Sequence, residues 1–177
     1  MRDDSQGPMQ VISGPIGRSK VHYVAPSARR LDAEMERFLG WFESNEQQDP
    51  LLKTAIAHLW FVTIHPFEDG NGRIARTIAE MCLARSDGSA QRFYSMSSQI
   101  LEERKSYYEI LEKTQSGSLD FTEWLRWFLE CLDRAIGAFE PNHEQCPDER
   151  VSLAGSEKEE CFYPFYGCCC QPPPSAL

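Results

Sequence analysis

The residues best suited to chemistry lie in one segment, 65–76, which reads His-Pro-Phe-Glu-Asp-Gly-Asn-Gly-Arg-Ile-Ala-Arg. This segment joins two predicted helices and combines an imidazole, two carboxylates, an asparagine and two arginines with two glycines. Gly70 and Gly72 let backbone amides approach a ligand closely. A helix that begins there directs its unpaired N–H groups and the positive end of its dipole to the same place. These features predict an anion site.

The charged side chains of the segment suit a polyphosphate. Arg73 and Arg76 are three residues apart, so both leave the first helical turn on neighbouring faces and can clamp phosphates. Asp69 offers the carboxylate oxygen that Mg²⁺ prefers. His65, at the end of the preceding helix, is placed to act as a general base for a hydroxyl. The residues alone therefore indicate a nucleotide or phosphate site with acid–base capacity.

The segment 65–76 also resembles the signature of the Fic (Fido) family, His-x-Phe-x-Asp/Glu-Gly-Asn-Gly-Arg-x-x-Arg, and matches all eight of its specified positions. A match of this length is far more specific than a lone glycine-rich loop. The segments 13–26 and 104–111 look familial as well, so the resemblance extends over roughly residues 7–138. It implies an all-α fold: a Fic-type helical bundle with a short β-hairpin flap near the N-terminus.

The resemblance implies AMPylation, the Mg²⁺-dependent transfer of AMP from ATP to a Ser, Thr or Tyr hydroxyl of a target protein. His65 is then the base that takes the hydroxyl proton, and Asp69 coordinates Mg²⁺ on the α- and β-phosphates. Arg73 contacts the β- and γ-phosphates. Arg76 faces the γ-phosphate or an inhibitory glutamate, with a structural ion pair as the alternative. The anion hole is formed by Gly70, Asn71 and Gly72, with Asn71 near the α-phosphate.

Two further sites follow from the resemblance. Tyr107 and Tyr108 border the adenine, and Gln115 stands where some relatives use Asn against the base. The two tyrosines point about 100° apart on a helix, so at most one of them touches the nucleotide. The exposed edge of the flap binds the target's backbone as an extra strand, through Lys20, Val21, His22 and Tyr23. The alternative is a hairpin edge without a partner.

Two other functions stay open at this point. Relatives of this fold transfer UMP, phosphocholine or phosphate, although the Gly-Asn-Gly-Arg stretch favours AMP. The other alternative is a truncated domain that binds nucleotide or target without catalysis. The sequence holds no full match to the inhibitory helix of many relatives, since the nearest candidate, 156–160, is followed by Cys161 and lies in the tail. We therefore expect a fragment or a shortened member with weak autoinhibition.

Hydrophobic periodicity and turn residues predict the elements that position these side chains. Residues 1–26 hold a hairpin with strands at 9–12 and 20–24, residues 27–140 form the helical core, and 141–177 form a disordered tail rich in Cys and Pro. Five helices are expected, at 27–42, 49–64, 72–85, 98–115 and 120–139. Asp49 caps the second helix, and Pro66 is expected to end it by holding His65 in an extended conformation. His58, within that helix, is expected to be structural.

Composition limits the remaining possibilities. The 177 residues carry 18 Lys+Arg and 27 Asp+Glu, a formal net charge of −9, with 41% apolar and 25% charged residues. This is the composition of a soluble globular protein, and no stretch is long enough to span a membrane. The acidic balance argues against nucleic acid as a partner. We expect a cytoplasmic protein that binds ATP and a target protein, and the sequence leaves a homo-oligomer open.

Overall fold

The computed structural model describes residues 1–5, 7–13, 15, 18–44, 48–87, 93–117 and 120–138. All of them belong to one compact unit, Met1–Pro141. The predicted tail, 141–177, lies outside the described residues, and so does the candidate inhibitory segment within it. Among the helices that are described, none has the length and apolar character that crossing a bilayer requires.

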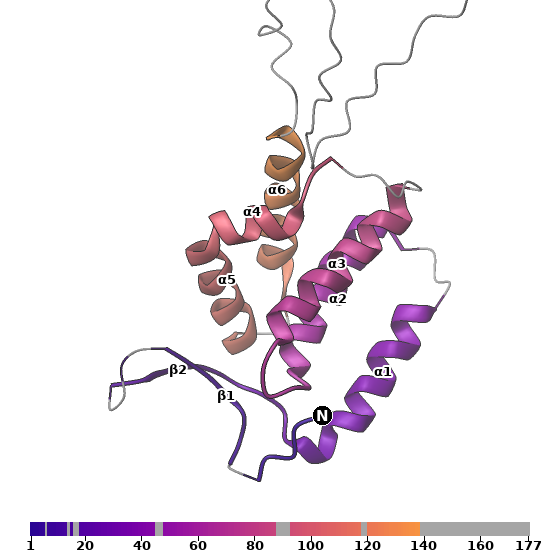
Figure 1. Cartoon of the computed structure of the whole chain (residues 1–177). Coiled ribbons are helices and arrows are strands. Elements are labelled where there is room, and N and C mark those ends of the chain that lie inside the picture. Colours follow the sequence, from indigo (N-terminus) through magenta and orange to yellow (C-terminus); the bar gives the residue numbers. More distant parts are fainter. Residues whose placement is uncertain are drawn as a thin grey trace, which may run out of the picture. The chain divides into compact units, whose positions relative to one another are not determined.

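The described residues form a helical bundle with one β-hairpin, as the sequence predicts (Figure 1). In chain order the elements are β1 (Gln10–Ser13), β2 (Lys20–Val24), the 3₁₀ turn η1 (Ala28–Arg30), α1 (Leu31–Glu43), α2 (Pro50–Ile64), α3 (Asn71–Asp87), α4 (Met96–Glu102), α5 (Arg104–Ser116) and α6 (Thr122–Gly137). In Figure 1 the hairpin extends away from the helices, and α2 and α3 run side by side.

Helix α2 is the centre of the bundle and packs against α1, α3 and α6. Its residues are apolar nearly all round, which is the pattern of a helix buried on every side. The predicted start of this helix is confirmed, because Asp49 Oδ1 accepts hydrogen bonds from the N–H groups of Leu51 at 2.9 Å and Leu52 at 3.1 Å. Helix α3 lies against α2, and both helices carry small buried side chains, namely Ala55, Ala57, Ala75 and Ala79.

One predicted helix, 98–115, is wrong, because the structure divides this region into α4 and α5 at Glu103. The Glu103 carboxylate binds Arg134 of α6 through two hydrogen bonds of 2.6 Å and also accepts one from Gln99 Nε2 at 2.7 Å. No glycine or proline marks this position, so the bend has no local signal in the sequence. The bend lets α4 and α5 each pack against α6.

The hairpin is antiparallel, with Val11 opposite Tyr23 and Ile12 opposite Val21. This register leaves His22 as an extra residue on β2, which is a β-bulge. In a regular strand His22 and Tyr23 would point to opposite faces. The bulge accounts for why these consecutive side chains are both half-buried, and both line the cavity described next.

Candidate functional site

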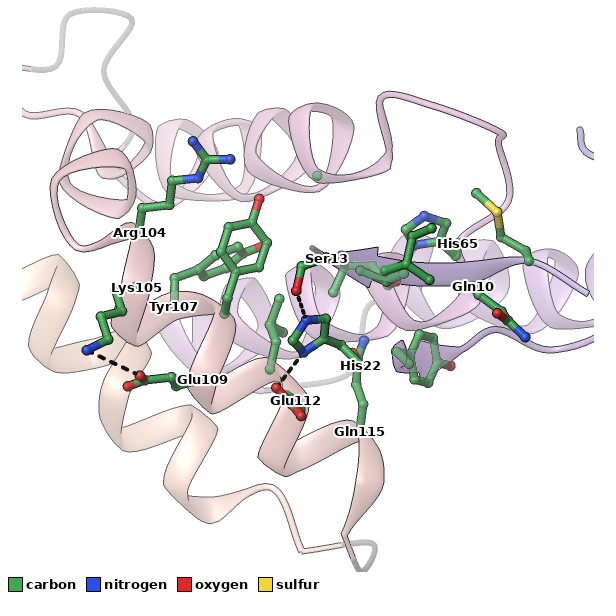
Figure 2. Close-up of a pocket in the computed structure, with 18 of the residues that line it drawn as sticks. Gln10, Ser13, His22, His65, Arg104, Lys105, Tyr107, Glu109, Glu112 and Gln115 are labelled. Carbon is green, nitrogen blue, oxygen red and sulfur yellow. Dashed lines mark hydrogen bonds and ion pairs between the residues drawn. The ribbon is translucent and has the colours of Figure 1, made fainter. Parts of the chain in front are cut away.

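A cavity of about 710 Å³ lies between the hairpin, the end of α2, the start of α3, and α5. Figure 2 shows His65 at one end of it and Arg104 at the other. Eight of the residues predicted from the sequence line this cavity: His22, Tyr23, His65, Gly72, Arg76, Tyr107, Tyr108 and Gln115. The other predicted residues lie outside this lining. They are Asp69, Gly70, Asn71 and Arg73 on the segment that leads into α3, and Lys20 and Val21 on β2.

His65 ends α2 in a left-handed conformation, with φ 52° and ψ 57°. The expectation of an extended His65 is therefore wrong. Proline disfavours the right-handed helical region for the residue before it, but the left-handed region also ends a helix, and histidine adopts it more readily than most residues. In this conformation the His65 N–H still donates to the Phe61 carbonyl at 3.1 Å.

The imidazole of His65 is half-buried, and its Nδ1 lies 3.2 Å from the Val62 carbonyl oxygen. A carbonyl only accepts, so Nδ1 carries the proton in the neutral ring and Nε2 keeps its lone pair. Burial lowers the pKa of His65 from its ordinary value of 6.5; the Val62 carbonyl raises it and the Arg2 cation lowers it. At neutral pH the ring is therefore an uncharged base.

The first turn of α3 meets this cavity next to His65. Gly70 precedes the helix with φ 85°, a conformation that favours glycine, and its carbonyl accepts the first helical hydrogen bond, from Ile74 N–H at 3.0 Å. The N–H groups of residues 71–73 have no partner within the helix, as at any helix N-terminus. A Cβ on Gly72 would lie 3.8 Å from Arg76 Nη1, which is an ordinary van der Waals contact, so Gly72 and the Arg76 guanidinium are neighbours.

Asn71 is 2% exposed and holds the preceding loop together. Its Oδ1 accepts from the Phe67 N–H at 3.0 Å, and its Nδ2 donates to the Phe67 carbonyl at 2.7 Å. These two bonds close the turn between α2 and α3. One Nδ2 hydrogen remains for another acceptor. The expected contact of Asn71 with an α-phosphate stays a prediction, and it would have to use that hydrogen.

Asp69 is the residue expected to bind Mg²⁺. Its carboxylate is 91% exposed, and Oδ2 lies 2.9 Å from Arg73 Nη2. Mg²⁺ is commonly held by one or two carboxylates together with substrate phosphates and waters. Asp69 fits that role, since it presents an open carboxylate where α3 begins. The described residues contain no group of three or more His, Cys, Asp or Glu side chains that would hold a metal ion by themselves.

Arg76 brings a positive charge to the cavity wall. It is half-buried, lines the cavity and forms no ion pair within the part of the chain that the structure describes. Burial lowers the pKa of His58, and the Arg76 charge lowers it further. Burial raises the pKa of Tyr107, and the Arg76 charge opposes that rise. The structural ion pair that the sequence left open for Arg76 is therefore not formed with the described residues, and the guanidinium is placed to meet an anion.

The two tyrosines of α5 have different environments. Tyr107 is 3% exposed and its hydroxyl lies 3.0 Å from His58 Nε2, whereas Tyr108 is 48% exposed and stacks with Arg104. His58 is fully buried and therefore packs as the sequence predicts for a structural histidine. Tyr108 is thus the tyrosine with more surface available to a ligand, although both tyrosines line the cavity.

Glu112 of α5 is a cavity residue that sequence reasoning missed. Its Oε1 lies 2.6 Å from Lys20 Nζ, and its Oε2 lies 2.6 Å from His22 Nδ1, while His22 Nε2 lies 2.5 Å from Ser13 Oγ. Figure 2 shows the two hydrogen bonds that connect Ser13 to His22 and His22 to Glu112. Spacing could have found Glu112, because it follows Tyr108 by four residues and precedes Gln115 by three, which places all three on one stripe.

The hairpin is also attached to α2. The Tyr23 hydroxyl donates to the Thr63 carbonyl at 2.8 Å, and Gln115 Nε2 donates to Thr63 Oγ1 at 3.1 Å. Burial raises the pKa of Tyr23 to about 12, so its hydroxyl keeps the donated proton. Lys20, His22 and Tyr23 were predicted to dock a target. In the structure their side chains bind helices of the same chain.

Comparisons with known proteins agree with the motif. Residues 2–83 match the sequence model of the Fic/DOC family. A protein adenylyltransferase Fic of Nematostella vectensis is 31% identical over 121 residues, which cover 66% of this chain and 26% of that protein. Its namesake in Drosophila melanogaster is 26% identical over 154 residues, 84% of this chain and 30% of that protein. The chain therefore spans about a quarter to a third of the length of these relatives.

Solved structures agree as well. The crystal structure of a Fic family protein from Desulfovibrio desulfuricans superposes with a TM-score of 0.63 at 30% identity and covers 75% of this chain and 39% of that one. A Fic domain containing signalling protein from Bacteroides thetaiotaomicron gives a TM-score of 0.55 at 23% identity, over 73% of this chain and 50% of that one. The second likeness supports the fold alone.

Proposed function

Because residues 2–83 place this chain in the Fic/DOC family, we propose that it is a protein adenylyltransferase, an enzyme that transfers AMP from ATP to a Ser, Thr or Tyr hydroxyl of a target protein. Relatives that bear the name protein adenylyltransferase support this class of activity. The observation that carries the proposal is the neutral His65 base, whose tautomer is fixed by Val62, at the cavity where α3 begins.

The reaction follows from these positions. His65 Nε2 takes the proton of the target hydroxyl, and the resulting oxygen attacks the α-phosphorus of ATP. A bond forms between that oxygen and phosphorus, the bond from phosphorus to the bridging oxygen of the β-phosphate breaks, and pyrophosphate leaves. Nucleotidyl transfer depends mainly on positioning and on stabilising charge, so the residues around His65 matter as much as the base.

The phosphates are stabilised by the start of α3. The free N–H groups of residues 71–73 and the positive end of the helix dipole favour an anion there. Arg76 lines the cavity. Arg73 can also bind a phosphate if it gives up its exposed ion pair with Asp69. Asp69 is the residue that would hold Mg²⁺, which supplies positive charge to the phosphates when bound. Tyr108 offers its aromatic ring to the adenine of ATP, and Gln115 offers its side-chain amide.

The hairpin is the proposed docking site for the target. The described sheet has only two strands, so the outer edge of each is free of further β-pairing within that part of the chain. An extended segment of the target can add to such an edge through its backbone. Lys20, His22 and Tyr23 support this docking indirectly, since they attach the hairpin to α5 and α2.

A label-transfer experiment tests the proposal. The full chain is incubated with a cell lysate, Mg²⁺ and ATP labelled in either the α- or the γ-phosphate, and the label on protein is measured. We expect α-label on protein above that of the lysate alone, no γ-label beyond what the lysate's own kinases add, and a loss of the α-label of roughly 10²- to 10⁴-fold in His65→Ala. The matched control is Arg29→Gln, which changes an exposed arginine of η1 that does not line the cavity and is expected to keep full activity.

Each other outcome identifies a different function. Transfer of γ-label above the lysate background, lost in His65→Ala, indicates a kinase. Transfer of label from α-labelled UTP in place of ATP indicates UMP transfer. ATP binding measured by calorimetry without label on protein indicates a domain that binds nucleotide or target without catalysis. Circular dichroism of His65→Ala verifies that the lost activity does not come from unfolding.

A further inference from the structure

The N-terminal segment contacts the backbone on which His65 is mounted. Arg2 Nε donates to the His65 carbonyl at 2.8 Å, and the Arg2 backbone N–H donates to the Pro66 carbonyl at 3.0 Å. Arg2 is only 6% exposed, which is rare for an arginine unless its charge is paired. One residue therefore binds both carbonyls that follow the helix, 63 residues away in the sequence.

The guanidinium is itself held from the other side. Its Nη1 binds the Asp4 carboxylate, and its Nη2 binds the Pro26 carbonyl at the end of the hairpin. The second oxygen of Asp4 accepts from the Ala28 N–H at 2.6 Å. Arg2 thus has three acceptors arranged around one planar group, and a planar group with three fixed bonds has little freedom to move.

His65 needs such support because of its backbone. A left-handed residue other than glycine is strained and persists only where its surroundings hold it. The next residue is a proline, which has no N–H to fix the turn. The Val62 contact orients the imidazole ring, but it does not hold the two carbonyls after it. Among the described residues, Arg2 makes the hydrogen bonds to both.

We propose that Arg2, supported by Asp4, is a positioning residue that holds His65 in its left-handed conformation and so keeps Nε2 directed at the cavity. The proposal rests on the proposed function for the role of His65. Arg2 touches no reacting atom and acts only through the His65–Pro66 backbone. Its positive charge has a second effect, since it adds to burial in keeping His65 neutral.

Two substitutions separate geometry from charge. Arg2→Gln removes the guanidinium and its charge, and Arg2→Lys keeps the charge but loses the planar set of bonds. For Arg2→Gln we expect kcat for label transfer to fall by roughly 10-fold, with the KM for ATP within about 2-fold of the natural chain, because a small misplacement of a reacting group costs rate. The acidic limb of its rate–pH profile moves to higher pH.

Arg2→Lys is expected to leave the acidic limb near its natural position while kcat stays well below the natural value. Arg29→Gln, the exposed control, changes neither. The proposal is overturned if Arg2→Gln lowers only the melting temperature, with kcat and the acidic limb unchanged. A full rate in Arg2→Lys overturns it too, since charge would then suffice. Asp4→Asn, which keeps Arg2 itself, is the milder variant should Arg2→Gln not fold, and it lowers kcat in the same direction.

A measurement without ATP separates this proposal from the proposed function. Proton NMR follows the titration of the His65 ring in the natural chain and in Arg2→Gln. We expect a higher His65 pKa and shifted ring resonances in the variant. If the natural chain transfers no label, the proposed function fails while this titration still tests Arg2. Identical His65 titrations and ring shifts in the two proteins would show that Arg2 does not position this histidine.

Discussion

The middle of α2 and its C-terminal end each present one histidine, and the two have opposite properties. His58 lies within the helix, and His65 follows it seven residues later as the left-handed residue that ends the helix. His58 is fully buried, and burial lowers its pKa to about 3, with a smaller contribution from Arg76. His65 is half-buried and lines the cavity. The same residue type has therefore become a packing element in one place and a candidate base in the other.

The neighbours of each ring explain the difference. His58 packs against the rings of Tyr107, Trp124 and Phe128, with centroids 5.4 to 5.8 Å away, and its Nδ1 has no hydrogen-bond partner among the described residues. At the end of α2 the chain leaves the helix, and the hairpin, α3 and α5 surround a space in place of a core. A charged imidazole is strongly disfavoured in the first environment and tolerated in the second.

Exchanging each histidine for alanine gives the largest expected effects. His58→Ala opens a cavity among aromatic rings and leaves the Tyr107 hydroxyl without its partner, so the free energy of unfolding falls by about 3 kcal/mol. His65→Ala lowers that free energy by less than about 1 kcal/mol and lowers label transfer by roughly 10²- to 10⁴-fold. Denaturant unfolding and transfer assays on both variants measure this. If His65→Ala is the less stable of the two variants, the conclusion that His58 is the packing histidine is wrong.

Acid should affect the two regions differently. An unfolded histidine titrates near 6.5, whereas His58 stays neutral in the folded chain down to about pH 3. Below pH 6.5 the unfolded state therefore binds a proton that the folded state does not bind. This one group then lowers the free energy of unfolding by up to about 1.4 kcal/mol for each pH unit of acidification. His65 titrates in the folded chain, below 6.5, and the transfer rate falls as it gains its proton.

Histidine NMR resonances at a series of pH values verify this prediction, with His65→Ala used for assignment. Two distinct behaviours are expected: a His65 midpoint below 6.5, and a His58 signal that does not titrate before the protein unfolds. A His58 midpoint near 6.5 would contradict the view that this ring is sealed from solvent.

Tyr107 belongs to both regions, and it gives the smallest expected effect. Its hydroxyl lies within hydrogen-bond distance of His58 Nε2, and the residue lines the cavity. Tyr107→Phe leaves His58 Nε2 unpaired and lowers the unfolding free energy by about 1 kcal/mol, while the KM for ATP changes little. Tyr108→Phe, on the exposed neighbour, is the matched control and leaves stability near its natural value. A large rise in the KM for ATP in Tyr107→Phe would instead show that the Tyr107 hydroxyl takes part in nucleotide binding.

The sequence by itself determined the parts that depend on neighbours in the chain. The motif 65–76 is contiguous, so its residues were recognisable together, and the family it indicates agrees with the comparisons. The Asp49 cap, the hairpin and the helical core follow from local spacing and apolar periodicity, and the structure confirms them. The buried role of His58 was expected from its place within an apolar helix.

Tertiary structure alone decided the parts that depend on distant contacts. Arg2 reaches His65 across 63 residues, and Glu112 reaches His22 across 90. The bend at Glu103 accompanies its bonds to Arg134, and the bulge at His22 appears only when the two strands pair. The left-handed conformation of His65 also depends on distant contacts, because we infer that the hydrogen bonds from Arg2 hold it and local preference alone does not select it. Such contacts leave no periodicity in the sequence, since they are fixed by how the helices pack and close their loops.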